Sequence, residues 1–522
     1  MTQRQVMQAL SGLLLGMFVA ILSSTIVSNA LPHIVADLGG SQSSYTWVVT
    51  STLLAMTAST PLWGKLADLY DKKRLIQTAL VIFVTGSVLA GLSHGTALLI
   101  AMRAVQGIGT GGMVALSQIV LASMIPPRER GRYNGYLGAV FAVATVAGPL
   151  IGGVVTDTSW LGWRWCFYVG VPFAVVALAV LQQTLRLPVG DGGKRVDWSG
   201  AALLTSTVSL LLVWVTLAGD SFAWNSWQTY AMVGGALVLA ALFILAENRA
   251  ADPVIPLRLF RNRTIALAGT VSLFVGSAMF AATVYLSQYF QLARGDSATK
   301  AGLMTIPMIT GLFLASTVSG RFITRTGRWK GWLVAGGTLL TAGVALLGGL
   351  HYDTPYWQVG VAMALTGLGL GMSMQNLVLA AQNQADGTDL GATSSLVAFT
   401  RSLGGTIGVS ALGAVLSNRV THYVADGLAR IDAPAGASDT QGAVPNVSEL
   451  REPLRTVVKS AYGDGIADVF MFAAPAALLG LLLTLFIRET ALRDRTPESE
   501  RPASTSGDTP TTGADAVPGA SA

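Results

Sequence analysis

Long apolar segments alternate with short polar segments along almost the whole chain. Each apolar segment has about 20 residues, the length that a helix needs to cross the hydrocarbon core of a bilayer. Strands of a transmembrane barrel would instead give segments of about 10 residues with alternating polarity. The pattern predicts an all-α polytopic membrane protein with fourteen spans, at residues 10–32, 45–66, 75–93, 97–122, 133–156, 165–186, 199–218, 227–246, 265–291, 301–320, 332–350, 357–380, 391–416 and 466–487.

The composition agrees with this class of protein. Of 522 residues, 52% are hydrophobic and only 11% are charged, whereas soluble domains have about 25% charged residues. The 59 glycines suit closely packed transmembrane helices. A single cysteine, Cys166, excludes an intrachain disulfide and a cysteine-based metal cluster. We expect no metal site and no cofactor.

The net charge of +6 carries information about orientation. Most of the 33 Lys and Arg residues fall in the alternate loops that lie on the same side as the N-terminus. The short loops on the other side hold only Arg164, Arg294 and Lys300. Because basic loops stay in the cytoplasm, we predict a multi-pass protein of the plasma membrane with both termini cytoplasmic, which contacts the lipid bilayer and no nucleic acid.

The chain contains an internal repeat. Gly64 to Arg74 follows the second span, and a similar segment, Gly320 to Lys330, follows the tenth span at an offset of 256 residues. The same offset relates the glycines of the fifth and thirteenth spans, and an offset of 260 relates those of the fourth and twelfth. These pairs are Gly148 and Gly404, Gly152 and Gly408, Gly107 and Gly367, Gly109 and Gly369, and Gly111 and Gly371. Two parallel halves with a cavity between them are a transporter architecture.

The repeat divides the chain into four parts. Residues 1–190 form an N-terminal six-helix half, and residues 191–250 form an inserted pair of helices. Residues 251–490 form the C-terminal six-helix half, with an external loop at 417–465. Residues 491–522, rich in Pro, Ser, Thr and Gly, are predicted to be a disordered cytoplasmic tail.

Arg103 lies inside an apolar segment of the fourth span, and no obvious acidic partner lies in any comparable segment. All 27 Asp and Glu residues fall in loops, tails or the ends of spans. A charge at membrane depth costs several kcal/mol unless it is paired or hydrated, so it marks a functional site by default. The alternative is an arginine whose head reaches the membrane surface.

Five sequence motifs resemble those of a known family. Gly64 to Arg74 resembles the cytoplasmic loop motif of the major facilitator superfamily. Arg103-Ala-Val-Gln-Gly-Ile-Gly resembles the span-four motif of its proton-coupled members, and Ala147 to Gly153 resembles the span-five antiporter motif. Leu22 to Pro32 and Trp163-Arg-Trp-Cys-Phe-Tyr resemble landmarks of the fourteen-span drug/proton antiporters of the EmrB/QacA type.

The resemblance implies a coupling site, but one expected residue differs. Many family members carry an Asp in span one where this chain has Ser23. The candidates for proton coupling are therefore Arg103, Asp37, His33 and Asp157. His33 would titrate near neutral pH if unperturbed. The alternative for Asp37, His33 and Asp157 is that each is an ordinary polar residue at the membrane surface.

Two further motifs predict conformational roles. Gly64, Asp68, Lys72, Lys73 and Arg74 could form a cytoplasmic latch between the halves, or serve only as a basic anchor. The antiporter motif comprises Gly148, Pro149, Gly152 and Gly153. A proline within a helix removes a backbone hydrogen bond and favours a kink. The alternative is a packing kink with no role in coupling.

The polar residues within the spans predict the substrate cavity. They are Ser23, Asn29, Thr50, Tyr285, Gln288, Gln375, Asn376 and Arg401. Lipophilic cations are often recognised by buried acids and aromatic faces, so a lining without acids favours neutral, zwitterionic or anionic amphiphiles. For each residue, a hydrogen bond between packed helices is the competing interpretation.

These observations together predict a monomeric secondary active exporter that moves drugs or amphiphilic secondary metabolites by proton antiport. The alternatives are a lipid or glycolipid translocator with the same fold, and a receptor or scaffold that transports nothing. An enzyme is not expected, because the spans hold no nucleophile–base pair, metal cluster or phosphate loop. The segment Gly107 to Gly112 follows no strand and lacks the lysine of a nucleotide-binding loop, so helix packing explains it better.

Overall fold

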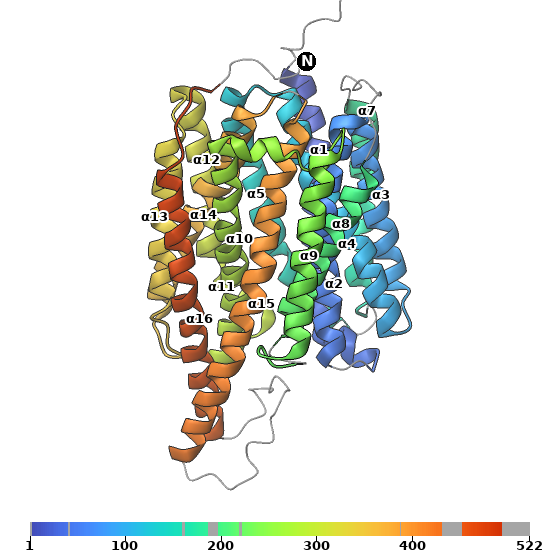
Figure 1. The fold of residues 1–522 in the computed structure, drawn as a ribbon. Coiled ribbons are helices and arrows are strands. Elements are labelled where there is room, and N and C mark those ends of the chain that lie inside the picture. The colour runs from blue at the N-terminus through green and yellow to red at the C-terminus, as the bar shows by residue number, and fades with distance from the viewer. Residues whose placement is uncertain are drawn as a thin grey trace, which may run out of the picture.

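The structure is a computed structural model that describes residues 3–39, 42–158, 162–185, 197–218, 222–386, 388–430 and 452–492. It is a bundle of long helices whose axes are roughly aligned with one another (Figure 1). In the described part, thirteen helices are long and apolar enough to cross a membrane. Helix α2 is also long, with 28 residues, but is rich in Ser and Thr. The prediction of an all-α polytopic membrane protein is confirmed.

The N-terminal half contains seven helices, the short α6 and α7 together forming one span. They are α1 (Gln3–Asp37), α2 (Gln42–Leu69), α3 (Lys72–Gly91), α4 (Thr96–Met124), α5 (Pro127–Asp157), α6 (Trp165–Tyr168) and α7 (Gly170–Thr184). We call the end of the bundle where α1 begins and α2 ends the latch face (Figure 1).

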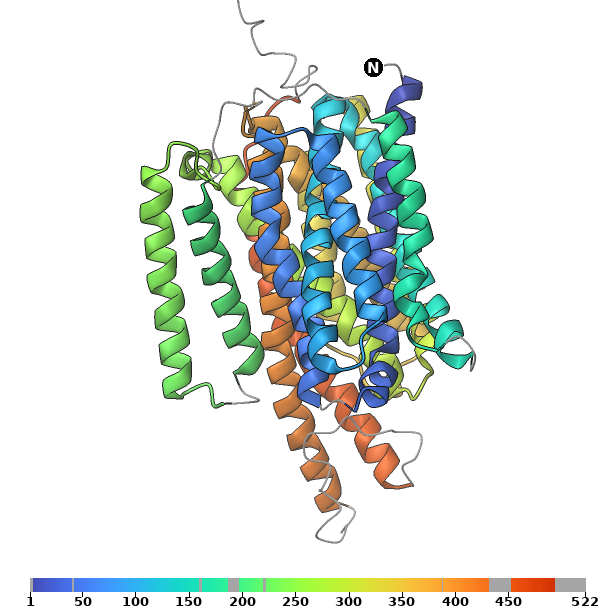
Figure 2. The same cartoon turned by 90° about the vertical axis from the view of Figure 1, so that its right-hand side faces the viewer.

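The inserted pair consists of α8 (Trp198–Leu217) and α9 (Trp227–Arg249). Figure 2 shows this pair at one side of the bundle. The C-terminal half follows a short linker. Its elements are η1 (Leu257–Arg261), α10 (Arg263–Gln288), η2 (Tyr289–Ala293), α11 (Ala298–Met304), α12 (Ile306–Thr326), α13 (Lys330–Leu347), α14 (Tyr356–Gln384), α15 (Leu390–Arg430) and α16 (Leu454–Leu485).

The two halves pack as the internal repeat predicts. Gly107 of α4 lies against α2, where an added Cβ would collide with the carbonyl oxygen of Thr52. Gly367 of α14 lies in the same way against the carbonyl oxygen of Met308 in α12. Thr52 and Met308 are themselves 256 residues apart. The glycines of α4 thus lie within an unbroken helix and permit the close approach of another helix.

The external loop predicted at 417–465 is shorter than expected. Helix α15 continues to Arg430 and α16 begins at Leu454, so both helices project beyond the rest of the bundle (Figure 1). Polar contacts between the two projections stabilise them: the carboxylate of Asp468 accepts a hydrogen bond from Tyr423 at 2.9 Å and pairs with Arg419 at 3.2 Å. Hydropathy could not predict these helical segments because their exposed residues are polar.

The predicted disordered tail lies outside the described residues from position 493 onwards. Just before this tail, the chain packs against the start of α13 and the end of α14. The carboxylate of Glu489 accepts hydrogen bonds from the backbone N–H groups of Trp329 and Lys330 at 2.9 and 3.2 Å. Gln384 donates to the hydroxyl of Thr490 at 2.6 Å. These bonds satisfy backbone groups at the start of α13.

Candidate functional site

The two halves meet at the latch face through the carboxylate of Asp68. This side chain, at the end of α2, accepts hydrogen bonds from the backbone N–H groups of Gly391 and Ala392 at 2.7 and 2.8 Å. Both donors belong to the first turn of α15, where N–H groups lack partners within the helix and the helix dipole favours a negative charge. Gly64 permits the approach, since a Cβ there would collide with Ser395.

The remaining residues of the predicted latch differ in what they contact. Lys72 is buried and its charge acts on Asp68. Lys73 instead donates to the backbone carbonyl of Gln182 at 2.6 Å, within its own half. Arg74 is largely exposed and lies 3.7 Å from Asp71. The structure therefore brings Gly64, Asp68 and Lys72 together at the junction, but neither Lys73 nor Arg74.

A second ion pair secures the start of α15. Arg258, in the linker that precedes the C-terminal half, binds Asp389 with two nitrogens at 2.9 and 3.2 Å. The hydrogen bonds that Arg258 donates to the carboxylate of Asp389 raise the pKa of its guanidinium. Because Asp389 directly precedes α15, the linker fixes the helix end that Asp68 also contacts.

Arg130, which sequence reasoning placed among ordinary basic loop residues, is buried between the halves at the latch face. It is 1% exposed and donates to the carbonyl oxygens of Ala122 and Ile125 at 2.5 and 2.8 Å. Its remaining nitrogen donates to the amide oxygen of Gln382 in α14 at 2.9 Å. Gln382 in turn donates to Ser394 of α15 at 2.9 Å. Nothing in the sequence separates Arg130 from its exposed neighbour Arg128.

This contact predicts the effect of replacing Gln382 with Leu. Among the described residues, the change removes the side-chain partner of Arg130 in the other half but leaves its two backbone acceptors, so the halves should separate more readily. Hydrogen bonds to charged groups contribute about 1.5–3 kcal/mol, which corresponds to roughly 10- to 100-fold in an opening equilibrium. With Cys166→Ser as background, a thiol reagent should label Ala122→Cys faster by that factor.

The matched control is Gln384→Leu on the same helix, because in the described part of the chain Gln384 bonds to Asn262 and Thr490, both in the C-terminal half. That variant should label at the parental rate. Equal labelling of Ala122→Cys in the Gln382→Leu and parental proteins would contradict a role for Gln382 in joining the halves.

Arg103 belongs to a buried polar cluster in the N-terminal half. Its guanidinium donates to the amide oxygen of Gln106 at 2.5 Å and to the backbone carbonyl of Val48 in α2 at 3.5 Å. The amide nitrogen of Gln106 donates to Ser23 of α1 at 3.1 Å and to Ser87 of α3 at 2.8 Å. Arg103 and Gln106 together thus connect α4 with α1, α2 and α3.

This arrangement refines the sequence interpretation of Arg103. The side chain of Arg103 contacts α2, and Gln106 makes the contact with α1. Ser23, where many relatives of the resembled type carry an acid, accepts a hydrogen bond and provides no counter-charge. Arg103 is 3% exposed, and in the described part of the chain its guanidinium donates hydrogen bonds to neutral groups.

Of the other coupling candidates, only the side chain of Asp37 is described. It lies at the end of α1 that is remote from the latch face and accepts a hydrogen bond from the indole nitrogen of Trp163 at 2.7 Å. It also lies 3.8 Å from Arg164, and its side chain is 57% exposed. The side chains of His33 and Asp157 are outside the described residues.

The antiporter motif places α5 against α1. A Cβ on Gly148 would collide with the side chain of Thr25, and the Thr25 hydroxyl donates to the carbonyl of Ala144 at 3.3 Å, one turn earlier in α5. The helix runs unbroken through position 149. Gly152 is buried, and the burial of Pro149 and of Gly153 is outside what the structure describes.

The predicted cavity residues do not form one lining. Several bind within their own half: Ser23 to Gln106, Tyr285 to the carbonyl of Val409 at 2.5 Å, and Asn376 to the carbonyl of Met372 at 2.7 Å. Thr50 is buried and Gln288 is half-buried. Asn29 is outside the residues whose side chains are described.

Gln375 and Arg401 remain the predicted cavity residues that lie towards the middle of the molecule. Gln375 borders a small gap between the halves, together with Gln118, Arg130 and Gln382. Arg401 is 6% exposed, and its Nη1 has no hydrogen-bond partner in the described part of the chain. On α15 it lies seven residues after Ser394, about two turns along the same face. An unpaired buried guanidinium is costly unless another group compensates it.

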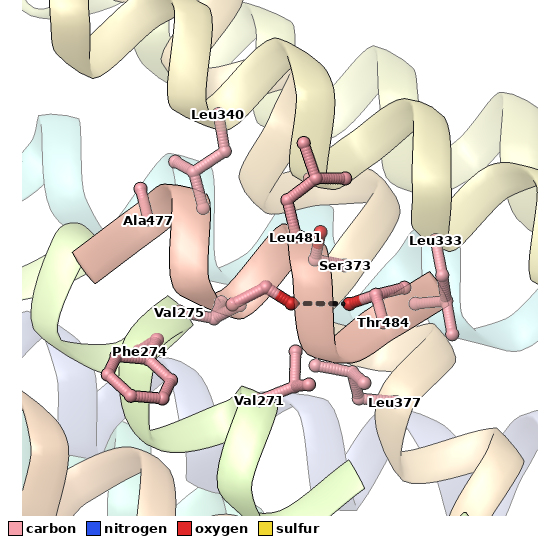
Figure 3. A pocket seen from close by; sticks show the side chains of 12 residues that line it. Val271, Phe274, Val275, Leu333, Leu340, Ser373, Leu377, Ala477, Leu481 and Thr484 are labelled. Atoms are coloured by element: carbon pink, nitrogen blue, oxygen red, sulfur yellow. Dashed lines mark hydrogen bonds between the residues drawn. The ribbon is translucent and has the colours of Figure 1, made fainter. Parts of the chain in front are cut away.

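A second crevice lies inside the C-terminal half and is a packing defect (Figure 3). Val271, Phe274 and Leu340 are among its mostly apolar walls, which come from α10, α13, α14 and α16. The hydroxyl of Thr484 donates to the carbonyl of Gly480 at 2.8 Å and so offers no free group. The volume is about 10 Å³, which is no more than one water molecule occupies.

Two equivalent helical halves that meet across a polar junction define a secondary transporter. The sequence profile of the Major Facilitator Superfamily matches residues 13–409. The chain belongs to this superfamily, whose members are transporters and not enzymes.

Several relatives are similar over most of their length. The multidrug transporter protein MdtP of Bacillus subtilis is 32% identical over 517 residues, which cover 94% of this chain and 95% of the relative. The efflux pump FUS6 of Gibberella moniliformis is 33% identical and covers 91% and 86%. The uncharacterized MFS-type transporter Rv1877 of Mycobacterium tuberculosis is 36% identical and covers 93% and 70%.

Solved structures share the fold. The proton:xylose symporter XylE aligns with a TM-score of 0.63 at 13% identity, over 96% of this chain and 99% of that chain. The human organic anion transporter MFSD10 aligns with a TM-score of 0.61 at 15% identity, over 92% and 99%.

Proposed function

We propose that this protein is a secondary active exporter that moves drugs or amphiphilic secondary metabolites out of the cell by proton antiport. The protein acts as a monomer in the plasma membrane, with both termini and the latch face in the cytoplasm. The excess of basic residues at the latch face supports this orientation. The name of FUS6, an efflux pump, supports the direction of transport, and the name of MdtP, a multidrug transporter, supports drugs as substrates.

The observation that carries the proposal is the capping of α15 by Asp68. A carboxylate of one half that binds the helix end of the other half is a contact that rigid-body rocking of the halves can make and break. With this contact formed, the cytoplasmic entrance is closed. The latch must then close for the substrate to be released outside, and it must open for the protein to return to the inward-facing state. Each transport cycle therefore closes and opens the latch once.

Arg401 supports a preference for substrates that carry an anionic or carbonyl group. The buried Nη1 has no partner in the described residues and can donate to such a group. Arg401→Met should therefore lower the export of a sulfonated fluorescent amphiphile by about 10-fold or more, as expected for one lost hydrogen bond to a charge. Export of the quaternary-ammonium analogue should change much less.

The control for this prediction is Arg325→Met, which removes an exposed positive charge at the end of α12. It should leave both export rates unchanged. Equal losses for the anionic and cationic amphiphiles in Arg401→Met would show that the residue only supports the fold.

The proposed function is tested in proteoliposomes with an imposed pH gradient and no ATP. Both amphiphiles should accumulate against their own gradients only while the proton gradient lasts, and a protonophore should abolish this accumulation. Accumulation that persists after the proton gradient collapses would contradict proton antiport, and complete absence of transport for a broad compound panel would contradict export.

A further inference from the structure

The inserted pair docks on the two helices that form the latch. Leu204 and Val208 of α8 pack in one apolar cluster with Ala58 of α2 and with Leu396 of α15. Val254, from the linker after α9, belongs to the same cluster. The contact of the pair with the halves runs through α8, while α9 packs mainly on α8.

Glu247 is a buried carboxylate near the latch-face end of α9. It is 3% exposed, and its Oε1 accepts hydrogen bonds from the backbone N–H groups of Val254 and Ile255 at 3.1 and 3.5 Å. Its Oε2 is buried and has no partner in the described part of the chain. Glu247 thus holds the linker in place with one oxygen and leaves the other unsatisfied.

A second carboxylate lies beside it. Asp197 caps α8, and its Oδ1 accepts from the N–H of Gly200 at 2.9 Å and from the hydroxyl of Ser199 at 2.6 Å. Its Oδ2 is also buried without a partner among the described residues. A Cβ added to Gly200 would contact both Asp197 Oδ2 and Glu247 Oε1, so the two carboxylates border the same small space.

The charged groups that act on Glu247 from neighbouring elements are Asp197 on α8 and Lys65 on α2. Lys65 is buried and directly follows Gly64 of the latch. Two carboxylates and one ammonium leave an excess negative charge beside the buried oxygens Asp197 Oδ2 and Glu247 Oε2. Two carboxylates that lie close together repel each other when both are charged.

We propose that Asp197 and Glu247 form a proton-binding site at the base of the inserted pair. One shared proton removes the excess charge and supplies the donor that both unsatisfied oxygens lack. Loss of the proton leaves two like charges on either side of Gly200, which weakens the docking of the linker and of α8 against α2. The inserted pair thereby makes the latch region sensitive to cytoplasmic pH, independently of the residue that couples transport.

Infrared difference spectra of the purified full-length protein in lipid test the proton directly. At neutral pH the wild type should show the carbonyl band of a buried carboxylic acid, and Glu247→Gln should lack it. Asp197→Asn removes the like charge, so the remaining carboxyl should lose its proton at a lower pH than in the wild type. Asp353→Asn, which alters an exposed loop acid, is the control and should leave the band unchanged.

A second measurement tests the effect on docking. Val254 is 1% exposed, so Val254→Cys in the Cys166→Ser background reports release of the linker. At alkaline pH, the thiol should be labelled several-fold faster in the protein that retains Glu247 than in the protein that carries Glu247→Gln. At acidic pH, the two proteins should be labelled at the same rate. Identical neutral-pH spectra of the wild type and Glu247→Gln would overturn the proton site, and equal labelling at both pH values would overturn its link to docking.

Discussion

Replacing Gly391 with Ala is expected to lower the transport rate by about 10- to 100-fold. An added Cβ would collide with the backbone carbonyl of Gly64 and with the carboxylate of Asp68, and a backbone atom cannot move aside like the end of a flexible side chain. Forcing an extra methyl group into a packed contact costs about 1–3 kcal/mol. That cost applies only while the latch is closed, so it shifts the conformational equilibrium towards the open state. Transport into inverted vesicles measures the rate.

The control is Gly331→Ala near the start of α13, where an added Cβ meets open space and no loss is expected.

Asp68→Asn should also slow transport, because the amide carries no charge for the helix dipole of α15. Since both substitutions disturb one contact, the double variant should lose less than the product of the two single effects. Full activity of Gly391→Ala would contradict a latch that closes at this point.

Replacing Gln106 with Leu is expected to destabilise the protein more than any other single change in the N-terminal cluster. The substitution removes the acceptor of the buried Arg103 guanidinium and the donor that Ser23 and Ser87 share. A buried charged group left without its partner costs about 2–3 kcal/mol. Thermal unfolding in detergent should therefore begin at a clearly lower temperature than in the wild type.

Adding Arg103→Met to Gln106→Leu should restore part of this stability, because an apolar pair of similar size leaves no charge unsatisfied. If Arg103 acts in coupling, the double variant should be stable yet unable to drive transport with a proton gradient. A double variant no more stable than Gln106→Leu would mean that the guanidinium is compensated elsewhere. Gln77→Leu, which removes an exposed bond to Gln182, is the matched control.

The fold was largely predictable because a bilayer constrains helices by length and apolarity alone. The glycine pairs of the repeat, such as Gly107 and Gly367, were informative because only glycine permits helix backbones to approach so closely. The ends of α15 and α16 were not predictable, because cross-helix pairs such as Arg419 and Asp468 extend both helices beyond the apolar segments.

The candidate site was predictable only in part. The contact of Asp68 follows from its position at the end of an apolar helix beside Gly64, where a charge needs a partner. The partner itself, the first turn of α15, carries no side-chain signal. Arg130 and Glu247 lie in loops or at helix ends by sequence, and only tertiary packing distinguishes a buried charge there from an exposed one.

Proton movement driven by substrate tests the central claim most directly. Proteoliposomes containing the full-length protein and a trapped pH-sensitive dye, with no initial pH gradient, receive the sulfonated amphiphile outside. Entry of the amphiphile through a proton antiporter should release protons from the lumen, so the lumen should become alkaline, and Gly391→Ala should slow this change as much as it slows transport. Uptake of the amphiphile with no change in luminal pH would contradict proton-coupled export.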